Sequence, residues 1–157
     1  MIEPGTPAPD FTLKDHSGEE LTLSELRGTR PLLVFYPLDF SPNCSDQLSI
    51  YQEVLPEIEA KGVVPLGISV DSSWAHRAFR KQLGLEIRLL SDFNPKGEVT
   101  RSYGAYLEQV GHGNRSLVLI DAEGVVEWVH ESEHPGVIPG ANPVSYTHLT
   151  LPTIYSV

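Results

Sequence analysis

The chain has a single cysteine, Cys44, and few positively charged residues. One thiol excludes a disulfide within the chain and a zinc site built from several thiolates, so any thiol redox chemistry needs a second molecule. Eleven Lys and Arg stand against 21 Asp and Glu, which gives a net charge of -10. Because such a surface repels phosphate backbones and anionic lipid headgroups, we expect neither nucleic acid nor a membrane as a partner.

Long hydrophobic runs and targeting signals are also missing. No run of about 18 apolar residues could span a bilayer, and the N-terminal MIEPGTPAPD has neither a basic region nor an apolar core. No internal repeat or Gly/Ser linker divides the chain. With 157 residues and 40% hydrophobic content, the sequence predicts one globular domain in the cytoplasm.

Short apolar runs alternate with helical patterns along the chain. The runs are nearly continuous rather than alternating, which is typical of strands buried on both faces of a sheet. Gly62 and Gly84 end the two longer helical patterns, and we expect Asn94 to cap a third, shorter helix. The sequence therefore predicts an α/β fold with a thioredoxin-like arrangement, a mixed central sheet flanked by helices. The expected strands are Leu32–Tyr36, Val63–Val70, Leu85–Leu90, Leu117–Ile120 and Val125–Val129, and the expected helices are Pro42–Lys61, Trp74–Leu83 and Pro95–Tyr103.

The C-terminal stretch differs from the rest, because residues 134–157 contain no Asp, Glu, Lys or Arg. Within it, VSYTHLTLPT (144–153) resembles the translation of a sequencing adapter. We therefore expect a domain over residues 1–143 and an artefactual tail over residues 144–157. The alternative is a genuine C-terminal strand, since Leu149, Thr150 and Leu151 alternate between apolar and polar.

Cys44 lies where a helix is expected to begin. Ser41 is a good N-cap and Pro42 suits the first helical position, which puts Cys44 in the first turn. The helix dipole favours a thiolate there. Apolar residues recur after Cys44 at helical spacing, so we expect the sulfur at a pocket mouth, with the helix kinked or shortened at Pro56. The alternative is a small buried side chain without chemistry.

The segment PLDFSPNC (37–44) resembles the active-site pattern of peroxiredoxins, Pro-x-x-x-Thr/Ser-x-x-Cys. The similarity runs from Gly5–Leu13 through Leu90–Asp92 and Tyr103–Gly104 to Asn114–Arg115. The chain is most similar to the one-cysteine alkyl hydroperoxide reductase E type. That resemblance implies a thioredoxin-like fold, the reduction of peroxides and a homodimer. It also implies a C-terminal amphipathic helix, which we expect to be missing from this chain, because the adapter-like string begins where the helix would stand.

The resemblance also assigns roles to four residues. Cys44 would be the peroxidatic cysteine, Ser41 the hydroxyl that holds peroxide and thiolate, Pro37 the shield behind the sulfur, and Arg115 the guanidinium that completes the pocket. Related sequences commonly have Glu where this chain has Gln47, so the contacts of that carboxylate are not expected here. No cofactor is expected. Because no second thiol is present, the reductant must be external: a thioredoxin-like, mycoredoxin-like or low-molecular-weight thiol.

Other patterns favour different functions. HESEH (130–134) matches the HExxH string of zinc proteases, but a strand leads into it and Pro135 follows, so we expect loop residues and no metal site. GHGNRS (111–116) lacks the third glycine of a dinucleotide fingerprint, and we expect a flexible loop that presents Arg115. The main alternative to a peroxidase is a binding or scaffold protein of the same fold in which Cys44 is silent.

Overall fold

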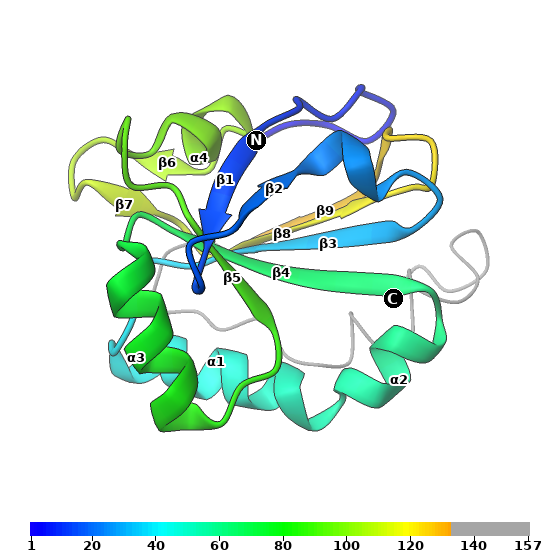
Figure 1. The fold of residues 1–157 in the computed structure, drawn as a ribbon. Coiled ribbons are helices and arrows are strands. Elements are labelled where there is room, and N and C mark those ends of the chain that lie inside the picture. The colour runs from blue at the N-terminus through cyan, green and yellow to red at the C-terminus, as the bar shows by residue number, and fades with distance from the viewer. Residues whose placement is uncertain (133–157) are drawn as a thin grey trace.

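The computed structural model describes residues 1–132 of the chain, and the expected tail over residues 144–157 lies outside them. A seven-stranded sheet has the order β2-β1-β5-β4-β3-β8-β9, with a separate two-stranded pair, β6 and β7 (Figure 1). The strands are β1 Thr12–Asp15, β2 Glu20–Thr22, β3 Arg30–Phe35, β4 Val63–Ser69, β5 Arg88–Ser91, β6 Tyr106–Leu107, β7 His112–Gly113, β8 Ser116–Ile120 and β9 Val126–Glu131. The helices are η1 Leu23–Leu26, α1 Pro42–Glu53, α2 Leu55–Ala60, α3 Ser73–Leu83 and α4 Glu98–Ser102.

The sheet is mixed, as the sequence predicts. Strands β3, β4 and β5 are parallel, and β3 aligns Leu33 with Leu66 of β4. On its other side, β3 pairs antiparallel with β8, and β8 with β9. The β1–β2 hairpin adds a second antiparallel edge beside β5, and the sequence did not predict this hairpin.

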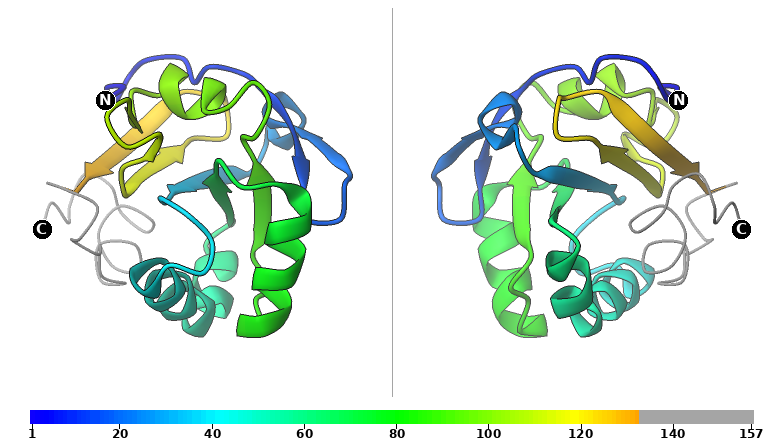
Figure 2. Two further views of the ribbon diagram at one scale, coloured as in Figure 1. Left: turned by 90° about the vertical axis from the view of Figure 1, so that its left-hand side faces the viewer. Right: turned by 90° about the vertical axis from the view of Figure 1, so that its right-hand side faces the viewer.

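Helices α1, α2 and α3 lie on one face of the sheet, whereas α4 and the N-terminal segment lie on the other (Figures 1 and 2). Alternate residues of β3 therefore enter two separate cores. Leu32, Val34 and Tyr36 pack toward α1, α2 and α3. Leu33 and Phe35 pack toward Phe11, Val99 and Tyr103 on the opposite face. This two-sided burial explains why the central strands are apolar at nearly every position.

The helix that follows β3 is interrupted where a proline was expected to disturb it. The helical run ends at Glu53, Val54 separates α1 from α2, and Pro56 lies in the first turn of α2. There its missing N–H removes no hydrogen bond of the helix. Gly84, with φ of 65°, ends α3 as predicted.

Two expected boundaries were wrong. The strand expected over Leu85–Leu90 is β5, which begins only at Arg88. The short helix begins at Glu98 rather than Pro95, because Gly97 has φ of 73° and turns the chain just before it. The N-cap position is Gly97 rather than Asn94, and the distant Asp92 carboxylate accepts from the amides of Val99 (3.1 Å) and Thr100 (2.8 Å) in the first turn. Within residues 1–132, no helix is long and apolar enough to cross a membrane.

Candidate active site

The loop between β3 and α1 delivers Cys44 to the first turn of a helix, as predicted. Ser41 occupies the N-cap position with extended backbone angles (φ -68°, ψ 143°), and Pro42 follows at the first helical position. The expected side-chain cap is absent, because the Ser41 hydroxyl donates to the carbonyl of Leu38 at 3.2 Å. Ser41 thus starts the helix through its backbone, and its hydroxyl lies on the loop side.

Three of the four expected site residues line one pocket. Pro37, Ser41 and Arg115 surround an open pocket of about 330 Å³, whose other lining residues are Leu38, Pro42, Asn43 and His112. The loop after β3 supplies one wall, and the chain between β7 and β8 supplies the other. His112 was not predicted as a site residue. Its Nδ1 lies 2.9 Å from the carbonyl of Gly113, and from the sequence His112 was noted only as part of the string GHGNRS, without a role of its own.

Cys44 itself is completely buried, which corrects the expectation of a sulfur at the pocket mouth. The apolar spacing that continues from Cys44 to Leu48 and Tyr51 places all three side chains in the core between α1 and the sheet. The pocket is lined by Asn43, the neighbour of Cys44, but not by Cys44. In this conformation the pocket therefore does not reach the sulfur.

Arg115 is also buried, with 2% of its surface exposed. The chain that presents it is not the flexible loop that was expected, since His112–Gly113 form β7 and β8 begins at Ser116. The guanidinium Nη1 donates to the Gln47 side-chain oxygen at 2.8 Å. Gln47 therefore provides an acceptor for Arg115 but adds no charge beside it.

Gln47 also faces Tyr51 within α1. Its Nε2 lies 3.4 Å from the Tyr51 hydroxyl, and both side chains are fully buried. Burial raises the pKa of Tyr51 to about 12, so the hydroxyl stays neutral at physiological pH. Arg115, Gln47 and Tyr51 thus form a polar chain inside the apolar layer that also contains Cys44.

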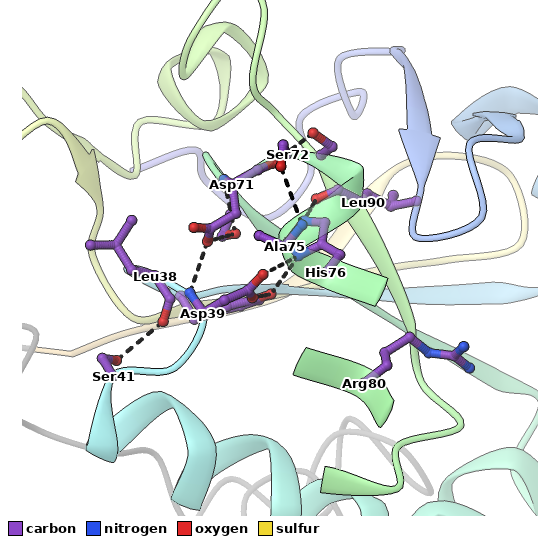
Figure 3. A network of polar contacts seen from close by, with 12 residues as sticks. Leu38, Asp39, Ser41, Asp71, Ser72, Ala75, His76, Arg80 and Leu90 are labelled. Atoms are coloured by element: carbon purple, nitrogen blue, oxygen red, sulfur yellow. Dashed lines mark hydrogen bonds and ion pairs between the residues drawn. The ribbon is translucent and has the colours of Figure 1, made fainter. Parts of the chain in front are cut away.

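A second cluster of buried side chains holds the loop between β3 and α1 on the side that faces α3 (Figure 3). Asp39, two residues before Ser41, contacts the Nδ1 of His76 at 2.7 Å and accepts from the Tyr36 hydroxyl at 2.6 Å. The amide of Asp39 donates to the Asp71 carboxylate at 2.8 Å. Sequence reasoning singled out none of these side chains, because they meet only through the packing of α3 on the sheet.

Asp39, Asp71 and His76 have the composition of a divalent-metal site, with one ligand atom from each within 4.8 Å of the others. Their contacts favour hydrogen bonding instead. Metal–ligand bonds of about 2.0–2.1 Å keep the ligand atoms of a tetrahedral site about 3.3 Å apart, whereas the Nδ1–Oδ2 distance is 2.7 Å. The other ring nitrogen of His76 lies 2.9 Å from the carbonyl of Leu90. Both nitrogens are therefore occupied by oxygen partners.

The HExxH string does not form the helix that a zinc protease requires. His130 and Glu131 belong to β9, where His130 aligns with Leu117 of β8. They are strand residues rather than the loop residues that were expected, while His134 lies outside the described residues. His130 therefore lies on a strand and not on the helix from which the first histidine of an HExxH site binds zinc.

Comparisons with known proteins agree with this geometry. A family model described as AhpC/TSA family matches residues 4–129. Alkyl hydroperoxide reductase E of Mycobacterium tuberculosis is 38% identical over 139 residues, which cover 88% of this chain and 90% of the relative. The putative peroxiredoxin bcp of Coxiella burnetii is 38% identical over 134 residues, which cover 82% of this chain and 87% of the relative.

Solved structures show the same fold. The reduced 2-Cys peroxiredoxin of Plasmodium vivax superposes with a TM-score of 0.81 at 26% identity, covering 92% of this chain and 79% of the other. The peroxidoxin BcpB of Mycobacterium tuberculosis superposes with a TM-score of 0.80, covering 92% of both chains, and at 24% identity it supports the fold alone. The chain belongs to the AhpC/TSA family of peroxiredoxins and has their thioredoxin-like fold.

Proposed function

We propose that this protein is a thiol-dependent peroxidase that reduces hydrogen peroxide and organic hydroperoxides by a one-cysteine mechanism. The observation that carries the proposal is that Pro37, Ser41 and Arg115 line one pocket. Pro42 and Asn43 also line it, and they belong to the helical turn that contains Cys44. Family membership supports the same reaction. The sequence contains one cysteine, which supports the one-cysteine form of the mechanism.

The first half-reaction oxidises Cys44. Its thiolate attacks one peroxide oxygen, the O–O bond breaks, and the sulfur loses two electrons to become a sulfenic acid while the other oxygen leaves as an alcohol or water after taking a proton. Full ionisation of a thiol with the ordinary pKa of about 8.5 gains only about 30-fold in thiolate concentration at pH 7, or about 2 kcal/mol. Stabilisation of the charge on the departing oxygen must contribute more to the rate, because one well-placed hydrogen-bond donor lowers the activation free energy by about 3 kcal/mol. Arg115 is one proposed donor, and the Ser41 hydroxyl is the other once it turns away from the Leu38 carbonyl to which it donates at 3.2 Å.

The second half-reaction needs two external thiols. The first condenses with the sulfenic acid to form a mixed disulfide and water, and the second attacks that disulfide and releases the Cys44 thiol. The reductant is a thioredoxin-like protein, a mycoredoxin-like protein or a low-molecular-weight thiol. Since such thiols are kept reduced in the cytoplasm, we place the reaction there.

Complete burial of Cys44 favours a second candidate, a binding protein of the same fold with a silent cysteine. A peroxide titration separates the two. Substoichiometric hydrogen peroxide should add one oxygen to the intact mass of the wild-type protein, or one dimedone with loss of water when dimedone is present, and leave Cys44→Ser unchanged. Wild-type protein that forms no sulfenic acid and consumes peroxide no faster than Cys44→Ser would establish the binding protein instead.

A further inference from the structure

Asp39 connects the loop that precedes the cysteine helix to three other residues. Its carboxylate contacts His76 Nδ1 at 2.7 Å and the Tyr36 hydroxyl at 2.6 Å, and its amide donates to Asp71 at 2.8 Å. The side chains of Asp39 and His76 are 1% and 0% exposed. Because the Leu90 carbonyl can only accept, His76 Nε2 must donate to it, and Nδ1 is the nitrogen that faces the loop.

The next residue, Phe40, has a left-handed backbone. Its φ of 69° is unusual for an aromatic residue and costs about 1–2 kcal/mol. Such a conformation persists only where its surroundings enforce it. The enforcing contacts come from one face of α3: His76 contacts Asp39, and Phe79, one turn later, packs edge-on against the Phe40 ring with 5.2 Å between centroids.

This turn at Phe40 determines where the site residues lie. Immediately after it, Ser41 enters the N-cap position (Figure 3). Cys44 follows in the first helical turn. A displacement of Asp39 would therefore move the Ser41 hydroxyl and the sulfur together. Misplacement of reacting groups by about 1 Å can cost about 100-fold in rate.

We propose that His76 is a positioning residue for the peroxidase reaction: through Asp39 it holds the left-handed turn at Phe40, and so places Ser41 and Cys44 opposite Arg115. The inference rests on the proposed function for its catalytic consequence. Loosening the Asp39–His76 contact slows the attack on peroxide and at the same time uncovers the buried sulfur.

Two substitutions of His76 separate positioning from packing. His76→Asn keeps an N–H near the position of Nδ1, within reach of Asp39, and loses the contact with Leu90, whereas His76→Gln places its amide near the position of Nε2 and loses Asp39. We expect His76→Asn to oxidise Cys44 with hydrogen peroxide within about threefold of wild type, and His76→Gln to be slower by about tenfold or more. Packing alone predicts the reverse order, because Gln replaces more of the histidine volume than Asn does.

Alkylation of Cys44 by iodoacetamide gives a readout that requires no peroxidase activity. It should be several-fold faster in His76→Gln than in wild type, and unchanged in His76→Asn, measured in native buffer with the thermal midpoint recorded for each variant. If wild-type protein does not react with peroxide, the proposed function fails, but the alkylation rates still decide whether His76 holds the loop. Equal effects of the two variants on both rates would overturn the positioning role.

A matched pair of tyrosines tests the same contact in variants that keep the core filled. Tyr36→Phe removes the hydroxyl that donates to Asp39 at 2.6 Å, and Tyr103→Phe removes one that donates to the Pro9 carbonyl at 2.6 Å on the opposite face of the sheet. Both tyrosines are fully buried. We expect Tyr36→Phe to slow peroxide oxidation and speed alkylation, and Tyr103→Phe to change neither. If both tyrosine variants behave alike, the loop is not held through Asp39.

Discussion

Arg115 and Gln47 together show how a neutral side chain orients a buried cation. The guanidinium is 2% exposed and donates through Nη1 to a neutral amide oxygen at 2.8 Å. A carboxylate partner would offset part of the guanidinium charge, whereas an amide directs the group and leaves its charge intact. Substitutions of Arg115 and of Gln47 can therefore test the charge of the guanidinium separately from its orientation.

Arg115→Lys tests the charge against its geometry. Lysine keeps the positive charge but has no planar fork, so it cannot face Gln47 and the departing oxygen in the same way. We expect the rate constant for peroxide oxidation of Cys44 to fall by about 100-fold, consistent with the loss of one well-placed donor. Stopped-flow measurement of sulfenic acid formation provides the number, and an unchanged rate would remove Arg115 from the site.

Gln47→Leu and Gln47→Glu test the orienting contact. Leucine has a similar volume but no acceptor, so it leaves the Arg115 Nη1 without its 2.8 Å partner. Loss of a buried partner of a charged group costs about 1–3 kcal/mol, and we expect a rate lower by about tenfold. Glutamate keeps the acceptor and should remain within about threefold of wild type. The same peroxide assay compares them, and a Leu variant as fast as the Glu variant would argue against an orienting role.

Among the elements, the β1–β2 hairpin depends on one carboxylate. Asp15 Oδ1 accepts from the amides of Ser17 (2.8 Å) and Glu19 (3.1 Å) across the turn, and Oδ2 accepts from Arg88 Nε of β5 at 2.7 Å. Burial raises the pKa of Asp15, but the hydrogen bonds from Ser17 and Arg88 outweigh it and lower the pKa to about 2. The ionised side chain thus holds the turn and connects the hairpin to the sheet.

Asp15→Asn should destabilise the protein in a pH-dependent manner. Since the folded-state pKa lies below the ordinary value of 3.8, the ionised carboxylate contributes about 2 kcal/mol above pH 4, and this contribution is lost as the pH falls toward 2. Urea unfolding at about pH 7 should show the full difference between wild type and variant. The difference should shrink between about pH 4 and pH 2, and a constant difference would contradict the linkage.

Elements with strong local signals could be predicted from the sequence. Strands β3, β4 and β8 are continuous apolar runs, and Gly84 and Pro56 mark helix boundaries by their own backbone restrictions. The weaker elements could not be predicted, because their residues gain order only from distant partners. Asp92 accepts from an amide in the first turn of α4 seven residues away, and the hairpin is held by Arg88 across a separation of 73 residues.

The same distinction applies to the site. Pro37, Ser41 and Cys44 belong to one short motif, and Arg115 entered through the family resemblance. The contacts that orient them join residues far apart in the chain: Asp39 and His76 are separated by 37 residues, and Gln47 and Arg115 by 68. Burial of Cys44 was also missed, because the helical stripe predicts that its side chain faces the core but not how completely the core closes over it.

At the scale of the whole molecule, we propose that residues 144–157 are not part of the domain. The family match ends at residue 129, and the string VSYTHLTLPT resembles an adapter. A chain that ends at residue 143 should then unfold within about 0.5 kcal/mol of the 157-residue chain. Urea denaturation followed by circular dichroism measures this, and a clearly lower midpoint for the shorter chain would favour a genuine C-terminal strand.

The enclosure of Cys44 by Leu48 and Tyr51 makes the two halves of the catalytic cycle differ in their response to heat. A peroxide needs a gap wide enough for two oxygen atoms, whereas a protein thiol needs room for a disulfide and the backbone that carries it. The wider opening breaks more native contacts, and its enthalpy adds to that of the chemistry. Arrhenius plots of the separate half-reactions should therefore be steeper for reduction by a protein thiol than for oxidation by hydrogen peroxide, and a small thiol such as cysteine should give an intermediate slope. Equal slopes would indicate that the sulfur is reached through one common opening, so that cooling would slow peroxide removal and enzyme recycling in proportion.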